Sequence, residues 1–241
     1  MGKKAGGYYR ATCHPWPCWL FVLPLLLAYE GGVLWLGGPN AELLRNGADH
    51  WLRRALLMIG LRWFWVPPAL LALIFVVWIW ARRQDRPGDL LGVLSGMILE
   101  SVAFALGLWA LSRILGPMLE PTGVTAQVPR ADSGMRQILP YLGAGIYEEA
   151  LFRLGLYTLL FGLFRLMDAP DWLSVCVAAI TSAILFSAAH HLGPYGQAYS
   201  HPVFVFRLAA GLYFAALFQT RGIGIAIGAH ACYNIMVSIG V

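Results

Sequence analysis

Long apolar runs alternate with short polar segments along the whole chain, a pattern typical of membrane proteins. A helix that crosses the bilayer needs about 20 mainly apolar residues. Runs that approach this length cover approximately residues 16–36, 63–80, 90–115, 137–166, 172–191, 202–221 and 222–241. We therefore expect an all-α integral membrane protein, a polytopic bundle of about seven transmembrane helices, within a range of roughly six to eight.

The composition supports this class of protein and excludes others. Of the 241 residues, 59% are hydrophobic and 12% are charged, whereas soluble domains carry roughly 25% charged residues. The net charge of +5 is spread over loops and helix ends. It therefore indicates membrane topology and contact with the lipid bilayer, and no nucleic-acid partner is expected. The four cysteines show no spacing typical of a metal site or a disulfide framework.

The region before residue 137 offers little diagnostic chemistry. Residues 40–62 alternate apolar and charged positions, which predicts an amphipathic helix at the membrane interface with tryptophan anchors. Glu30 lies in the first span and is expected to be a structural hydrogen-bonding group, whereas Glu100 in the third span has no evident partner. We divide the chain into residues 1–136, with the N-terminal helices and the amphipathic segment, and residues 137–241, which pack with them in one bundle.

Two adjacent carboxylates and a guanidinium interrupt the apolar run at 137–166. An ionised side chain at the bilayer centre costs about 2.5–3.5 kcal/mol on insertion scales, so these groups must satisfy one another or face a cavity. Glu149 and Arg153 are four residues apart with the acid first, the better order for an ion pair on a helix. Glu148 points about 100° away from Glu149, so it can remain available. A buried ion pair that locks two helices together is the alternative interpretation.

Two later spans carry further polar residues at helical spacing. Phe186 and His190 are four residues apart, and so are His230 and Asn234. A single histidine on an apolar helix is usually a satisfied core residue. Two helices that carry histidine, together with a third that carries paired carboxylates, are better explained by a functional site.

Two chemistries fit these residues. In the first, Glu148 is a general base that deprotonates a water with help from His190, while His230 and Asn234 donate hydrogen bonds to the oxyanion. In the second, Glu148, His190 and His230 bind zinc in the manner of metalloproteases. The chain has no His-Glu-x-x-His pattern, and an amide is a poor zinc ligand but a good oxyanion donor. We therefore favour the version without a metal or other cofactor, and keep zinc as the alternative.

The residues also carry a resemblance to a known family. The CPBP family comprises the type II CAAX prenyl endopeptidases and their bacterial relatives, also called the Abi family. Its three motifs resemble, in order along the chain, Glu148-Glu149-x-x-x-Arg153, Phe186-x-x-x-His190 and His230-x-x-x-Asn234. Each pattern is weak alone, but all three occur in sequence on apolar helices. The resemblance covers about residues 137–241.

The resemblance implies an intramembrane endopeptidase of the glutamate type. It implies that Glu148 is the base, that His190 assists it in water activation, and that His230 with Asn234 forms the oxyanion hole. The other residues of the motifs would contact these four and hold them in position: Glu149, Arg153 and Phe186. The expected reaction is hydrolysis of a peptide bond in or near the membrane-anchored C-terminal segment of a protein or peptide, as in CAAX-like processing or the trimming of sorting tails.

Localisation and alternative functions follow from weaker signals. Lys3, Lys4 and Arg10 precede the first span and favour a cytoplasmic N-terminus. The compact size and the absence of a targeting sequence favour a multi-pass protein of the bacterial inner membrane. A small transporter or a bacteriocin-immunity protein without proteolytic activity is the alternative from another class, since transport paths also contain intramembrane Glu, His and Arg. No inverted repeat supports the transporter.

Overall fold

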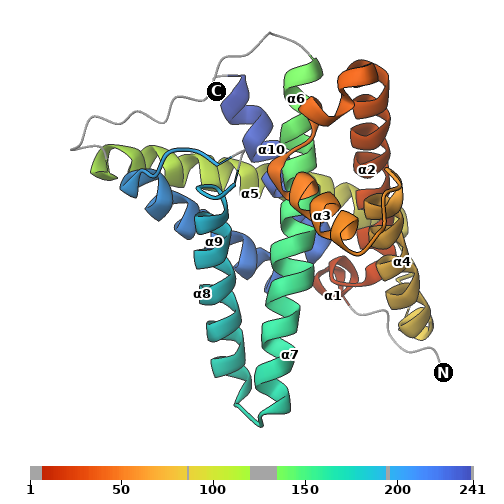
Figure 1. Cartoon of the computed structure of the whole chain (residues 1–241). Coiled ribbons are helices and arrows are strands. Elements are labelled where there is room, and N and C mark those ends of the chain that lie inside the picture. Colours follow the sequence, from red (N-terminus) through yellow and green to blue (C-terminus); the bar gives the residue numbers. More distant parts are fainter. Residues whose placement is uncertain (1–6, 86, 120–134, 194–195, 240–241) are drawn as a thin grey trace, which may run out of the picture.

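The computed structural model describes residues 7–85, 87–119, 135–193 and 196–239, and all regular structure among them is helical (Figure 1). The elements in chain order are α1 (Tyr8–Thr12), α2 (Pro15–Gly37), η1 (Gly38–Leu44), α3 (Gly47–Met58), α4 (Val66–Ala81), η2 (Arg83–Asp85), α5 (Leu90–Leu119), α6 (Met135–Gly143), η3 (Ala144–Glu148), η4 (Ala150–Tyr157), α7 (Thr158–Leu166), α8 (Asp171–Ala189), α9 (His201–Arg221) and α10 (Ile223–Ser238). The expected all-α class is confirmed. The sequence also predicts a polar loop from Gly116 to about residue 136, but α5 continues to Leu119, and residues 120–134 lie outside the described part of the chain.

Four helical segments of the described chain are long and apolar enough to cross a membrane. They cover Pro15–Leu44, Leu90–Gly116, Asp171–Ala189 and His201–Arg221. Val66–Ala81 and Ile223–Ser238 are apolar but shorter. The protein is therefore an integral membrane protein by the length and composition of its helices, while the number of about seven spans remains a prediction.

The long helix expected near residues 137–166 forms, but its middle is not an α-helix. Elements α6, η3, η4 and α7 follow one another as a single rod (Figure 1). Gly143, Glu149 and Thr158, at the junctions, keep right-handed helical backbone angles. The two central elements are π-helical, a rare geometry that occurs frequently at functional sites. Pro140 neither starts nor ends the helix, because it lies inside α6.

Helix α10 forms the centre of the bundle. It packs against α2, α5, α6, α9 and the π-helical elements. Every residue from position 223 to position 231 is buried, as expected of a helix that is apolar on all sides. Any polar side chain on this stretch, such as His230, is therefore held in a tightly packed environment.

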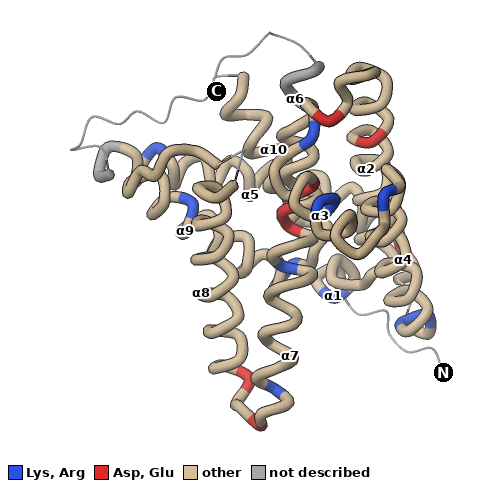
Figure 2. The backbone as a smooth tube through the Cα atoms, viewed as in Figure 1, with Lys and Arg blue, Asp and Glu red and all other residues tan. Residues whose placement is uncertain are grey.

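The amphipathic segment at residues 40–62 forms a 3₁₀ turn followed by α3, and some of its charged side chains face the protein. Arg45 and Asp49 are buried, and Asp49 binds both Arg45 (2.7 Å) and Arg53 (2.8 Å). Both arginines also reach Glu30 of α2, at 3.1 Å and 3.4 Å. The predicted helix forms as α3, and some of its charges pair with the partly buried carboxylate of Glu30, which needs these cations. Its position at the membrane interface stays a prediction. Figure 2 shows the charges gathered around α3 and the middle of the long rod.

Glu100, which had no evident partner in the sequence, forms an ion pair with Arg221. The guanidinium contacts both carboxylate oxygens at 2.6–3.0 Å. The same guanidinium lies 4.2 Å above the ring of Tyr9. This pair fastens α5 to the end of α9, directly before α10 begins.

The contact between the rod and α10 depends on Gly145. A Cβ atom at this position would lie 2.8–3.0 Å from the Cβ, backbone nitrogen and Cα of Ala231. Backbone atoms cannot yield as a flexible side chain can, so a larger residue would push the two helices apart.

We expect Gly145→Ala to lower the free energy of unfolding by about 1–3 kcal/mol, the usual cost of overpacking. The matched control is Gly162→Ala on α7, where a Cβ would meet no atom within 4 Å. Thermal unfolding of both purified variants in detergent measures the difference. Equal melting temperatures for the two variants would contradict the proposed tight contact.

Candidate active site

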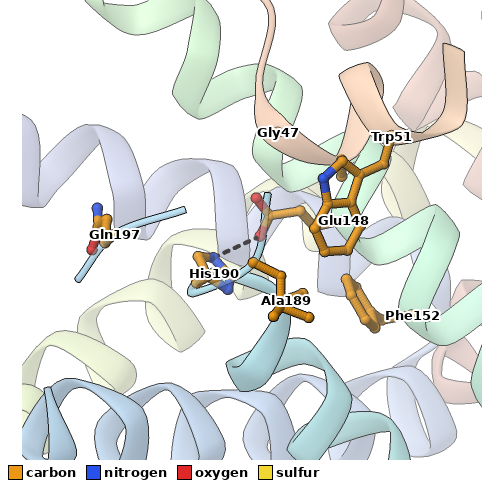
Figure 3. A pocket seen from close by; sticks show the side chains of 9 residues that line it. Gly47, Trp51, Glu148, Phe152, Ala189, His190 and Gln197 are labelled. Carbon is orange, nitrogen blue, oxygen red and sulfur yellow. Dashed lines mark ion pairs between the residues drawn. The ribbon is translucent and has the colours of Figure 1, made fainter. Parts of the chain in front are cut away.

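Glu148 and His190 line one open cavity of about 120 Å³ between the helices. The cavity is large enough for several water molecules, since one water needs at least roughly 10–15 Å³ of such space. Its walls come from α3, from the π-helical rod and from the end of α8 (Figure 3): Gly47, Ala48, Trp51, Glu148, Phe152, Ala189, His190, Leu192 and Gln197. A few polar side chains, here Glu148 and His190, among mostly apolar lining residues are typical of a small-molecule or active site.

The carboxylate of Glu148 faces two imidazoles. Its Oε2 atom lies 3.7 Å from Nε2 of His190 and 3.8 Å from Nε2 of His230. These separations are longer than direct hydrogen bonds, but all three atoms are close enough to contact one shared water. The structure therefore brings together residues from η3, from the end of α8 and from α10, as the sequence predicted.

The other nitrogen of His190 is fixed by the backbone. Its Nδ1 atom lies 2.8 Å from the carbonyl oxygen of Phe186, one turn earlier. A carbonyl can only accept a hydrogen bond, so Nδ1 must carry the proton. In the neutral imidazole, Nε2 is then an acceptor that faces Glu148 and the cavity.

The other nitrogen of His230 is fixed by a carboxylate. Its Nδ1 atom donates to Oε1 of Glu149 at 2.7 Å, and Oε2 of Glu149 lies 3.2 Å from Nε of Arg153. Glu149 and Arg153 are fully buried. The predicted ion pair therefore exists, and it extends to a third residue on another helix. Burial of two charges without solvent requires such mutual satisfaction.

Aromatic rings enclose this group. The Arg153 guanidinium lies 4.5 Å from the centre of the Phe186 ring and donates to the carbonyl oxygen of Gly211 at 3.0 Å. The His230 ring stacks on Phe214 at 4.4 Å, and Phe186 packs against the His190 ring at 4.9 Å. Phe186 also packs edge to face against the His230 ring at 6.1 Å, so it contacts residues of all three motifs. These packed rings limit the orientations that both imidazoles can adopt.

Asn46 completes the surroundings of Glu148, and the sequence analysis missed it. Its Nδ2 atom donates to Oε1 of Glu148 at 3.2 Å, while its Oδ1 atom accepts from the backbone nitrogen of Asp49 at 3.0 Å. Asn46 is therefore both the N-cap of α3 and a partner of the carboxylate. An asparagine before an amphipathic helix is a recognisable N-cap signal, but nothing in the sequence pairs it with Glu148, 102 positions away.

Asn234 lies one turn beyond His230 on α10 and is half-buried. Among the described residues, none forms a hydrogen bond with its amide. The structure therefore places Asn234 next to His230 on the same helix without a hydrogen bond to the other motif residues of the described chain.

Zinc remains the alternative prediction. Among the described residues, no group of three His, Cys, Asp or Glu side chains has the arrangement of a metal site. Nδ1 of His230 donates to Glu149 and Nδ1 of His190 to the Phe186 carbonyl, which leaves both Nε2 atoms facing Glu148. We derive no step through a metal, and the absence of a cofactor remains a prediction.

Comparison with protein families identifies the region that holds the three motifs. Residues 134–236 match the family model described as type II CAAX prenyl endopeptidase Rce1-like. The match includes every motif residue from Glu148 to Asn234 and confirms the resemblance to the CPBP family. Comparison with curated proteins and with solved structures gives no significant match.

We expect Asn46→Ser to reduce turnover of a membrane-anchored reporter peptide by about 2- to 10-fold, the effect of one lost hydrogen bond. Serine keeps an oxygen that can cap α3 but has no amide to donate to Glu148, so the melting temperature should stay near that of the wild type. Asn40→Ser, at an exposed position, is the control. Turnover of Asn46→Ser equal to that of the control would show that the contact does not orient Glu148.

Proposed function

We propose that this chain, whose residues 134–236 form a CAAX endopeptidase-like domain of the CPBP family, is an intramembrane endopeptidase of the glutamate type. It hydrolyses a peptide bond in or near the membrane-anchored C-terminal segment of a protein or peptide. One observation carries the proposal: the Glu148 carboxylate faces two imidazoles in a cavity within an apolar bundle. Apolar helices long enough to span the bilayer place this cavity in an integral membrane protein.

Glu148 and His190 bind and activate the water. A water in the cavity can donate one hydrogen to Oε2 of Glu148 and the other to Nε2 of His190, because both atoms are acceptors. Its oxygen lone pairs then face away from both residues and towards a substrate carbonyl. During attack the carboxylate takes the proton, which is general-base catalysis. Asn46 supports the geometry by holding the other carboxylate oxygen.

His230 and Asn234 stabilise the oxyanion that forms. Because Glu149 accepts the Nδ1 proton, Nε2 of His230 is a donor when the ring is an imidazolium. The Asn234 amide, one turn away on the same helix, supplies a second donor. Each oxyanion donor contributes about 2.7–4 kcal/mol in other hydrolases.

The two histidines thus have different roles that follow from their partners. The backbone carbonyl behind His190 takes its Nδ1 proton, so Nε2 of the neutral ring is an acceptor. The carboxylate behind His230 accepts from Nδ1, and in the proposed mechanism Nε2 of this ring acts as a donor. Arg153 is the partner that Glu149 needs, because removal of the guanidinium would leave an unpaired buried charge. No metal is needed for these steps.

We expect Glu148→Gln to lower the turnover of a reporter peptide by about 10²- to 10⁴-fold, the usual contribution of a general base. The amide nearly conserves the shape of the side chain but cannot accept a proton, so folding should be retained. The assay uses purified protein in lipid vesicles and peptides anchored by a prenylated cysteine or by a transmembrane helix. Asp171→Asn removes an exposed carboxylate at the far end of α8 and is the matched control. Near-normal cleavage by Glu148→Gln would refute the assignment of Glu148 as the general base. If the wild type cleaves neither peptide, the result would favour a transporter or an immunity protein.

We expect Asn234→Ala to slow turnover by roughly 100- to 1,000-fold with a smaller effect on substrate binding, because an oxyanion bond forms fully only in the transition state. Chelators should have little effect, and elemental analysis of active protein should find no stoichiometric zinc. A zinc enzyme would respond in the opposite manner. Hydrolysis lost on chelation and restored by zinc, with a mild effect of Asn234→Ala, would overturn the proposed mechanism.

A further inference from the structure

A second and larger cavity lies between α4 and the long rod. It has a volume of about 560 Å³ and opens at the surface of α4, since Leu70 and Ile74 line it and are 38% and 40% exposed. Its two long walls are positions 67, 70, 71, 74 and 78 of α4 and positions 147, 150, 151, 154 and 158 of the rod. Both sets have the spacing of one helix face. Because α4 packs mainly against α2 and α3, the two faces leave an elongated gap, which we call the α4 cleft.

The α4 cleft is separate from the cavity that holds Glu148. The two spaces share no lining residue among those described. On the rod, Glu148 lines the first cavity and Tyr147 lines the cleft, and on α3 the same division separates Trp51 from Leu52. A molecule in the cleft would therefore contact the rod on a different face from the one that carries the candidate active site.

The lining of the α4 cleft offers little hydrogen bonding to a bound molecule. The hydroxyl group of Tyr147 already donates to Glu30 at 2.5 Å, and that of Thr158 donates to the backbone carbonyl of Arg153 at 3.1 Å. The other lining side chains are apolar, apart from the indole N–H of Trp78. An extended peptide would bring backbone groups into this space without partners, which is costly in an apolar environment. The lining therefore fits a hydrocarbon chain.

The residues at both ends of α4 place the cleft at the depth of lipid acyl chains. Trp63 and Trp65 precede the helix and are exposed, and Trp80 is exposed at its end, where the Arg83 guanidinium lies 5.0 Å from the centre of its ring. Tryptophan and arginine are typical of the membrane–water interface. The 16 residues of α4 measure about 24 Å, close to the roughly 30 Å of the hydrocarbon layer.

We propose that the α4 cleft binds one acyl chain of a bilayer phospholipid. Acyl chains are the main molecules present at this depth, and a flexible chain can follow an elongated cleft. If the cleft were empty, its lining atoms would lose van der Waals contacts that a bound chain supplies. The chain packs against Leu151, Leu154 and the ring of Tyr147, the residue before Glu148, and so completes the packing of the rod on this face. The inference goes beyond the proposed peptidase function and does not rest on it.

The test uses wild-type protein in phosphatidylcholine vesicles that contain a phosphatidylcholine with a photoactivatable diazirine in the middle of one acyl chain. After illumination, mass spectrometry of peptides locates the attached lipid. Leu151 and Leu154 of the cleft should be labelled at least as strongly as Leu163 of α7, although they are less exposed than Leu163. This measurement needs neither a substrate nor a variant.

Two variants of α4 test whether the label depends on the space in the cleft. Ile74→Trp should lower labelling of Leu151 and Leu154 about 10-fold, which corresponds to the loss of roughly ten van der Waals contacts, while Leu163 keeps its label. Val76→Trp is the matched control, because Val76 is exposed on the same helix and does not line the cleft. It should leave all three positions labelled as in the wild type.

Three outcomes would overturn the proposal. Labelling of Leu163 with little label on Leu151 and Leu154 in the wild type would show that lipid only surrounds the protein. Equal labelling of the cleft in Ile74→Trp and Val76→Trp would show that no chain occupies the space beside Ile74. Displacement of the label by a peptide with a prenylated cysteine, added to Glu148→Gln protein so that it is not cut, would assign the cleft to the substrate instead. None of these results bears on whether Glu148 is the base, which the hydrolysis assay decides.

Discussion

The Arg153–Glu149 ion pair, extended by the imidazole of His230, is the interaction on which the rest of the site depends. These side chains are buried in an apolar bundle, where an isolated charge is far more costly than in water. They come from the π-helical rod and from α10, and Arg153 also reaches the Gly211 carbonyl of α9. The π-helical rod, α9 and α10 are thus connected by these contacts. The contacts fix the positions of Glu148 and His230 relative to each other.

A second polar network connects the N-terminal half of the chain to the same site. Glu30 accepts from the hydroxyl group of Tyr147 at 2.5 Å, and it shares Arg45 and Arg53 with Asp49. Tyr147 directly precedes Glu148, and Asn46, at the start of α3, binds the Glu148 carboxylate. The motifs all lie in residues 137–241, but the cavity includes residues of α3 as well. A fragment that lacked the N-terminal helices would therefore expose the base on one side.

Helices and contacts within one helix could be predicted from the sequence, whereas contacts between distant segments could not. The apolar runs predicted most helices, and the four-residue separation predicted the Glu149–Arg153 pair. The pairing of Glu100 with Arg221 joins positions 121 residues apart, and no local pattern encodes it. The inward orientation of Arg45 and Asp49 also depends on Glu30, which lies on another helix. The π-helical geometry near Glu148 has no recognisable signal in the residue types alone.

The division of labour between the two histidines illustrates how packing sets chemistry. His190 and His230 are the same residue type, each on an apolar helix, and the motifs alone cannot tell which is an acceptor. The difference lies in the hydrogen-bond partner of Nδ1. In His190 this atom donates to a backbone carbonyl, whereas in His230 it donates to the Glu149 carboxylate, which pairs with Arg153. Both partners accept a proton from Nδ1, and only the second partner is a carboxylate. The ion pair therefore stabilises the fold and also fixes which imidazole can donate a hydrogen bond to a developing negative charge.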